Sequence, residues 1–254
     1  MNPEYVAAAF AEETLKLGGV PEINFIAKKA GDLKLTTGRI VACDPLGFFE
    51  YDPFQREVPP RIYPVILYMA RGGVDYRVAY AKLEFAVGRV RSWERALRVG
   101  EQDSAEGYGV DLATGCFMDN AASRVMLDRW GENGEFSDEL SDNMSGEWAE
   151  YVLDQTTGLN IIYFTSGYGD GGYKSYWGLS ADGDVLCLVT DFEVPEGAAA
   201  WNARTRGFDR TRLSTFLGGG TESAKPKRWW EFWKWVSSLF VEICSAEVTR
   251  CLFA

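Results

Sequence analysis

The sequence predicts a mainly β fold of the α+β type, an antiparallel β-sandwich or sheet meander with helices only at its periphery. Three observations favour this class. Apolar and β-branched runs of strand length recur along the chain, as at 61–71 and 185–192. Residues 76–86 alternate apolar and polar side chains, which is typical of a half-buried strand. Asp182 and Gly183 stand between two strand-like segments and predict a tight hairpin.

The N-terminal part of the chain is predicted to be one helix followed by strands. Asn2 is a candidate cap, and Pro3 stands in the first turn of a helix over 3–17, which a glycine pair ends. Because Gly38 interrupts the segment 32–43, that segment is expected to form two strand pieces. Further strands are expected at 61–71, 76–86 and 90–97.

The second half of the chain is predicted to contain a middle helix and the central hairpin. Asp119 and Asn120 cap a helix over 121–130. The acidic stretch 131–143 is expected to be an exposed excursion, and 148–153 a short helix. Strands at 160–164 and 185–192 then flank a segment rich in glycine and aromatic residues, which is either a structural crossover or a recognition loop.

The domain organisation is predicted from a change of composition near residue 200. Residues 1–200 are expected to be a single β-rich domain, and 201–254 a basic linker followed by a Trp-rich amphipathic helix. That helix either docks on its own domain or makes a weak contact with a membrane surface or a partner. Its apolar run is too short to span a bilayer.

Composition limits the chemistry and the compartment. The chain contains no histidine, which excludes Ser-His-Asp and Cys-His catalysis and nearly every zinc site other than an all-cysteine one. Five widely spaced cysteines suit a reducing cytosol. No signal peptide is recognisable at the N-terminus. A cytoplasmic protein is therefore expected.

The negative charge is concentrated in one fifth of the chain. Residues 101–150 hold thirteen acids and two bases, which matches the net charge of −11 of the whole sequence. Nucleic acid is excluded as a partner, because phosphate contacts need Lys and Arg. An acidic face instead attracts a basic protein. The candidate partner-binding residues are acids and aromatic-loop residues: Glu132, Glu135, Asp138, Glu139, Asp142, Tyr168, Asp170, Tyr173, Tyr176 and Trp177.

A carboxylate-based or metal-dependent enzyme is the alternative. Several aspartates adjoin glycine, proline or a turn, where they could converge on a divalent cation or an acid–base pair, or only cap backbone amides. They are Asp44, Asp111, Asp119, Asp170 and Asp191. The enzyme hypothesis places Asp119, Asp170 and Asp191 in one site. The binding-module hypothesis requires neither a metal nor a cofactor.

Two further segments are weaker candidates for chemistry. Cys116 follows a glycine in a loop before the middle helix, but without histidine its activating base would have to be a carboxylate, so a packed thiol is the simpler interpretation. The glycines at 167–172 lack the Lys and Ser/Thr of a phosphate-binding loop.

Five segments together resemble one protein family. They are GRIVACDPL (38–46), RVAYAKLEF (77–85), GYGVDLATGCFMD (107–119), SGYGDGGYKSYWG (166–178) and LVTDF (188–192). In this order they resemble the bacterial family called domain of unknown function 4241, over roughly residues 30–195. The resemblance implies no established activity, but it implies a cytosolic bacterial protein. By analogy of size, acidity and compartment, the leading hypothesis is an immunity protein that neutralises a basic toxin domain.

Overall fold

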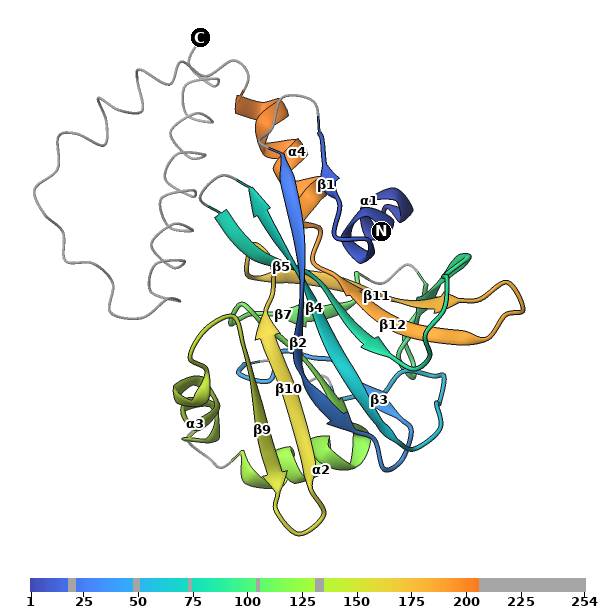
Figure 1. Cartoon of the computed structure of the whole chain (residues 1–254). Coiled ribbons are helices and arrows are strands. Elements are labelled where there is room, and N and C mark those ends of the chain that lie inside the picture. Colours follow the sequence, from blue (N-terminus) through green and yellow to red (C-terminus); the bar gives the residue numbers. More distant parts are fainter. Residues whose placement is uncertain (18–21, 48–50, 73–74, 104–105, 131–134, 206–254) are drawn as a thin grey trace, which may run out of the picture. The chain divides into compact units, whose positions relative to one another are not determined.

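The computed structural model describes residues 1–17, 22–47, 51–72, 75–103, 106–130 and 135–205. Across these residues the chain forms two antiparallel sheets that face one another, with helices outside them (Figure 1). The predicted fold class, mainly β with peripheral helices, is confirmed. The compact unit spans Met1–Arg204. The predicted Trp-rich C-terminal helix lies outside the described residues.

The larger sheet has eight strands in the part of the chain that the structure describes. Its order is β1-β2-β4-β5-β12-β11-β6, and β7 pairs with β11. Its strands are β1 (Thr14–Leu15), β2 (Ile23–Lys34), β4 (Ile62–Gly72), β5 (Asp75–Glu84), β6 (Ser92–Ala96), β7 (Tyr108–Val110), β11 (Gly171–Leu179) and β12 (Val185–Asp191). Strand β12 lies between β5 and β11, so two strands about a hundred residues apart in sequence are direct neighbours.

The smaller sheet, counted over the same described ranges, has four strands in the order β3-β8-β10-β9. They are β3 (Ile40–Val41), β8 (Thr114–Asp119), β9 (Trp148–Asp154) and β10 (Leu159–Thr165). Every residue of β10 is buried. A strand covered on both faces needs apolar side chains on both, which explains why the segment NIIYFT reads as a continuous apolar run rather than an alternation.

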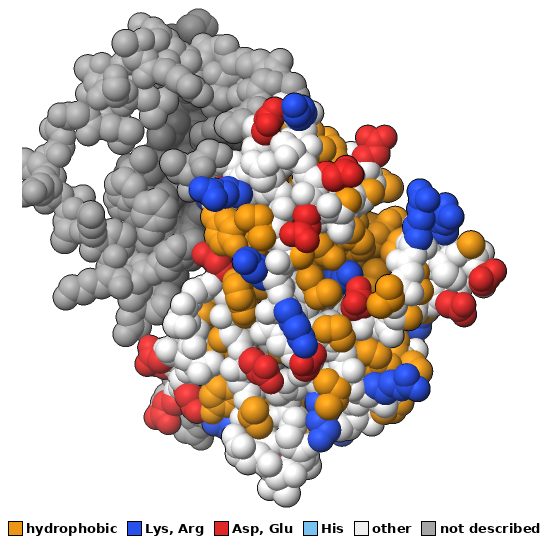
Figure 2. All heavy atoms as spheres, viewed as in Figure 1, with side chains coloured by type: hydrophobic (Ala, Val, Ile, Leu, Met, Phe, Trp, Pro, Cys, Tyr) orange, Lys and Arg blue, Asp and Glu red, His pale blue; other side chains and the backbone are white. Residues whose placement is uncertain are grey.

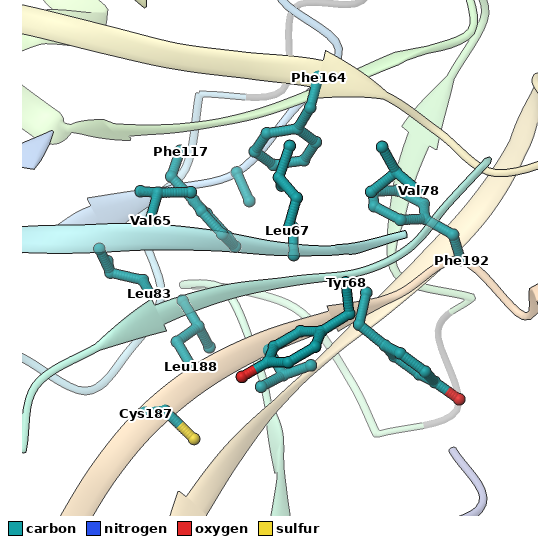
Figure 3. Packing of buried hydrophobic residues seen from close by; sticks show 14 of the residues in the cluster. Val65, Leu67, Tyr68, Val78, Leu83, Phe117, Phe164, Cys187, Leu188 and Phe192 are labelled. Carbon is teal, nitrogen blue, oxygen red and sulfur yellow. The ribbon is translucent and has the colours of Figure 1, made fainter. Parts of the chain in front are cut away.

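The main core lies between the two sheets. Phe117 of β8 and Phe164 of β10 point toward Val65 and Leu67 of β4 (Figure 3). Tyr68, the next residue along β4, points to the opposite side, where helix α1 (Pro3–Phe10) stacks the ring of Phe10 on it at 4.7 Å between centroids.

A second core lies on the other face of the smaller sheet. It is covered by helices α2 (Asn120–Arg129) and α3 (Glu135–Asn143). The strands contribute Cys116, Met118, Ile161 and Tyr163, which alternate with the residues that face the larger sheet. A fourth helix, α4 (Val194–Thr205), follows β12 and extends past residue 200, where composition places the start of the linker.

The structure corrects four predicted elements. Helix α1 ends at Phe10 instead of residue 17, because Thr14 and Leu15 pair with β2. The expected polar excursion contains α3. The short helix expected at 148–153 is strand β9, whose alternate residues face the two cores. Most of the glycine and aromatic loop is strand β11, whose hairpin with β12 turns at Gly183 as predicted.

No helix within the described ranges is long and apolar enough to cross a membrane.

Candidate functional site

The three aspartates of the predicted enzymatic site do not converge. Asp119 ends β8, whereas Asp170 accepts a hydrogen bond from the amide of Ala113, just before β8 begins. Six residues of strand separate these two points by roughly 20 Å. Asp191 lies at the end of β12 in the other sheet, opposite Lys174 of β11. The predicted acid–base or metal constellation is therefore not formed.

Asp119 and Asp170 instead support the backbone. Asp119 is fully buried and accepts hydrogen bonds from the amides and hydroxyls of Thr36 and Thr37 at 2.9–3.2 Å. It also caps α2 through the amide of Ala121 at 2.8 Å. Asp170 is exposed, and its carboxylate fixes the turn before β8. With five hydrogen bonds, the carboxylate of Asp119 has little capacity left to bind a cation or move a proton.

Asp44 plays the same part at another turn. Its carboxylate accepts hydrogen bonds from the amides of Leu46, Asp111 and Leu112 at 2.7–2.9 Å. Burial raises the pKa of Asp44, and these hydrogen bonds oppose that rise. Asp44 therefore joins the segment after β3 to the turn that precedes β8.

Asp191 occupies a different environment, because it is buried beside another acid. It is 2% exposed, and burial together with the neighbouring Glu196 of α4 raises its pKa to about 7. The Met1 amino nitrogen lies 3.8 Å from its Oδ2 and donates a hydrogen bond to the hydroxyl of Tyr176. Burial also raises the pKa of Glu196. These groups link the N-terminus, β11, β12 and α4, and of them Asp191 is buried whereas Met1, Tyr176 and Glu196 are half-buried.

The acidic residues on α3 form an exposed face. Phe136 and Leu140 are buried in the second core, which turns Glu135, Asp138, Glu139 and Asp142 outward. We call these four residues the acidic face. In Figure 2 acidic side chains gather at the left edge, where Figure 1 places α3. The fifth predicted acid, Glu132, lies outside the described residues.

Polar contacts fix the orientation of this helix. Arg129, in the last turn of α2, donates hydrogen bonds to both carboxylate oxygens of Glu139 and to the hydroxyl of Tyr151 of β9. Its guanidinium also lies 4.3 Å from the ring centroid of Phe136. Ser137 donates to the carbonyl of Leu46 at 2.6 Å. The acidic face is therefore held on a rigid support.

The aromatic residues predicted for the interface are mostly internal. Tyr173 and Trp177 are 7% and 3% exposed and belong to the main core, so they cannot contact a partner. Tyr176 is half-buried beside the Met1 amino group. Tyr168 is 36% exposed, with the guanidinium of Arg77 4.7 Å from its ring centroid. Of the aromatic set, Tyr168 is exposed and Tyr176 is partly exposed.

A family model matches residues 33–190, which is more than half of the chain. Its description is Protein of unknown function (DUF4241). The chain belongs to this family. No curated protein matches the chain. No solved structure matches it either.

The matched DUF4241 segment covers β3 to β11 entirely, and with them the second core, most of the main core and the acidic face. It begins near the end of β2 and ends one residue before Asp191. Helices α1 and α4, which cover the N-terminal group and Asp191, therefore lie outside the match. The acidic face belongs to the family segment, whereas the Asp191 and Glu196 cluster is at its border.

The structure also shows a groove that the sequence did not predict. A shallow hollow of about 440 Å³ lies beside α2. It brings Arg39 and Arg124 together with Val99 and Leu127, which are 47% and 45% exposed. Tyr51, Asp52, Pro53, Asn120 and Ser123 complete its lining. These residues come from four separate segments of the chain, so no local sequence motif predicts the groove.

Within the described ranges, no group of three or more cysteine, aspartate or glutamate residues is arranged to hold a metal ion.

Proposed function

We propose that this DUF4241 protein is a cytoplasmic protein-binding module, and specifically an immunity protein that neutralises a basic toxin domain through the acidic face. The acidic face is exposed, contains no basic residue along the helix and is held by Arg129. An array of like charges on a fixed helix attracts a cationic surface and speeds the encounter with it.

Asp142 carries this proposal, because its charge has no stabilising role in its own helix. Glu135 and Asp138 lie in the first turn of α3, where a carboxylate interacts favourably with the helix dipole. Asp142 lies in the last turn, where a negative charge opposes the dipole. Its side chain is exposed. Because this charge opposes the helix dipole, binding of an external cationic partner would offset its unfavourable interaction.

The shape of the surface favours a macromolecular partner over a small ligand. The acidic face is the outer side of a helix, whereas small molecules are bound in concave, mostly apolar pockets. Of the predicted aromatic residues, Tyr173 and Trp177 are buried, Tyr176 is half-buried and Tyr168 is exposed. The proposal therefore rests on the acids of α3 and not on the glycine-rich segment.

The test uses the purified product of the neighbouring gene and a matched pair of variants. We expect Asp138→Asn with Asp142→Asn to slow association about ten-fold, because long-range attraction between opposite charges is lost. Raising the salt concentration should reduce the wild-type rate toward the rate of this variant. Association rates are measured by surface plasmon resonance, and growth rescue is measured on co-expression.

The control variant is Asp182→Asn with Asp184→Asn, which removes the same charge from the exposed β11–β12 turn. It should bind and rescue growth like the wild type. Equal loss of binding in both variants would show that net charge, and not the acidic face, attracts the partner. If the neighbouring product is harmless and does not bind the wild-type chain, the immunity function is rejected.

A further inference from the structure

Cys43 and Cys116 form a close pair inside the second core. Their sulfur atoms are 3.6 Å apart, and both residues are fully buried. Both are free thiols. They come from segments more than seventy residues apart in the sequence, so the fold alone brings them together.

The strand register places the two cysteines opposite one another. In the β3–β8 pair, Ile40 faces Asp119 and Val41 faces Met118. Cys43 lies in the bend two residues beyond the end of β3, and an extension of this register would set it opposite Cys116, in agreement with the 3.6 Å between the two sulfur atoms. Directly opposed residues in such a ladder have Cα atoms about 4.5–5.5 Å apart, which lies within the roughly 4.4–6.8 Å that a disulfide requires. The pair can therefore close with little backbone movement.

The surroundings of the pair keep it reduced while the core is closed. Its neighbours are apolar side chains of the smaller sheet and of α2 and α3. The hydrogen bond with Cys116 and burial raise the pKa of the Cys43 thiol, so this thiol stays protonated near neutral pH. Since the thiolate is the reactive form, oxidation requires an opening of the second core that admits the oxidant and water.

We propose that Cys43 and Cys116 are a site of reversible oxidation, at which a hydroperoxide converts the thiol pair into an intramolecular disulfide. One sulfur attacks the peroxide, which forms a sulfenic acid and releases water or an alcohol. The second sulfur attacks the sulfenic sulfur, the S–S bond forms and a water molecule leaves. The two thiols lose two electrons and two protons, and the O–O bond of the peroxide is reduced. A dithiol reductant restores the pair.

The third described thiol lacks this arrangement. Cys187 belongs to the main core on β12, in the larger sheet.

Oxidation of the Cys43–Cys116 pair would have a structural effect at a contact that Asp44 already makes. Asp44 follows Cys43 and accepts hydrogen bonds from the amides of Asp111 and Leu112. A disulfide would add a covalent link beside this contact and fasten the segment after β3 to β8.

The test is a thiol map of the intact chain. The reduced protein is treated with hydrogen peroxide under native conditions, quenched, alkylated in denaturant and digested for mass spectrometry. We expect two of the five cysteines to escape alkylation, and the peptides that contain Cys43 and Cys116 to be joined by a disulfide. Dithiothreitol should restore both thiols. The oxidised chain should also unfold at a higher urea concentration than the reduced chain.

Two variants separate this pair from the other cysteines. Cys43→Ser should abolish the joined peptide, whereas Cys187→Ser should leave it unchanged. If either variant fails to fold, the thiol map of the wild-type protein still tests the proposal, because it identifies the joined peptides directly. Recovery of Cys43 and Cys116 as free thiols after prolonged native oxidation would overturn the proposal. The proposal would also be overturned if disulfides formed only in urea and joined several different cysteine pairs.

Discussion

Asp119 shows how a residue with catalytic potential can have a purely structural role. The cap of α2 could be predicted, because aspartate before a helix is a local signal. Its contacts with Thr36 and Thr37 could not, because they join segments more than eighty residues apart. A separation of more than seventy residues likewise hides the approach of Cys43 to Cys116. Sequence identifies a residue's chemistry more readily than its neighbours in space.

Asp191 is the residue at which stability should depend most clearly on pH. Its folded pKa of about 7 exceeds the ordinary value of about 3.9, so the folded state favours the protonated form. Its contribution to stability is greatest at low pH and is lost as the pH rises from about 4 to about 7. Compared with Asp191→Asn, the wild type should lose on the order of 2–4 kcal/mol over this range.

Urea unfolding of both proteins between pH 4 and 8 measures this difference together with its effect on the neighbouring Glu196, because the titration of groups that do not interact with Asp191 cancels in the comparison. Asp182→Asn, at an exposed turn, serves as the control and should keep the wild-type profile. If the wild type instead gains stability over Asp191→Asn as the pH rises, the attraction between ionised Asp191 and the Met1 amino group outweighs the effects of burial and Glu196.

At the scale of elements, the sequence predicted the strands with a clear apolar or alternating pattern better than the short or glycine-rich elements. Strands β4, β5, β10 and β12 were expected close to their observed bounds, because β4, β10 and β12 contain apolar runs and β5 alternates apolar and polar residues. Helix α3 was missed, since it has only two buried residues among polar ones. Strand β9 was mistaken for a helix because a short segment fits both periods. Glycine residues hid strand β11 from the prediction, although its Tyr173 and Trp177 are core residues.

Helix α3 allows stability and binding to be separated. Replacing Asp142 with Asn removes a negative charge near the C-terminal end of the helix dipole, so the fold should gain about 0.3–1 kcal/mol. The same change should weaken binding of the proposed basic partner. Urea unfolding at low salt measures the first effect.

Asp138→Asn is the matched control, because Asp138 lies in the first turn of the same helix. It should lower stability by a similar amount while also weakening binding. A loss of stability in Asp142→Asn would mean that its carboxylate makes a favourable contact within the protein, and the argument from its position on the helix would fail.

At the scale of the whole molecule, the smaller sheet joins two cores. Phe164 of β10 is fully buried between the sheets, with its ring centroid 5.5 Å from that of Phe117 and 6.0 Å from that of Phe192. Phe164→Ala should destabilise the protein by about 3–5 kcal/mol, because a large cavity forms at the contact between the sheets. Far-ultraviolet and near-ultraviolet circular dichroism should follow one common unfolding transition.

Leu127→Ala is the control for this change, since Leu127 is 45% exposed on α2. Its effect should stay within about 0.5 kcal/mol. Two separate transitions in Phe164→Ala would show that the sheets, each with its own core, can fold without one another.

The position of β12 has a consequence for synthesis on the ribosome. Strand β5 ends at Glu84 and its neighbour β12 begins at Val185. One edge of β5 pairs with β4, but the edge that pairs with β12 has no partner while the intervening hundred or so residues are synthesised. At synthesis rates of about 5–20 residues per second, this interval lasts on the order of 5–20 s. Throughout that time the nascent chain has an unpaired, apolar strand edge. Such an edge can pair with another chain and cause aggregation, and chaperones bind surfaces of this kind.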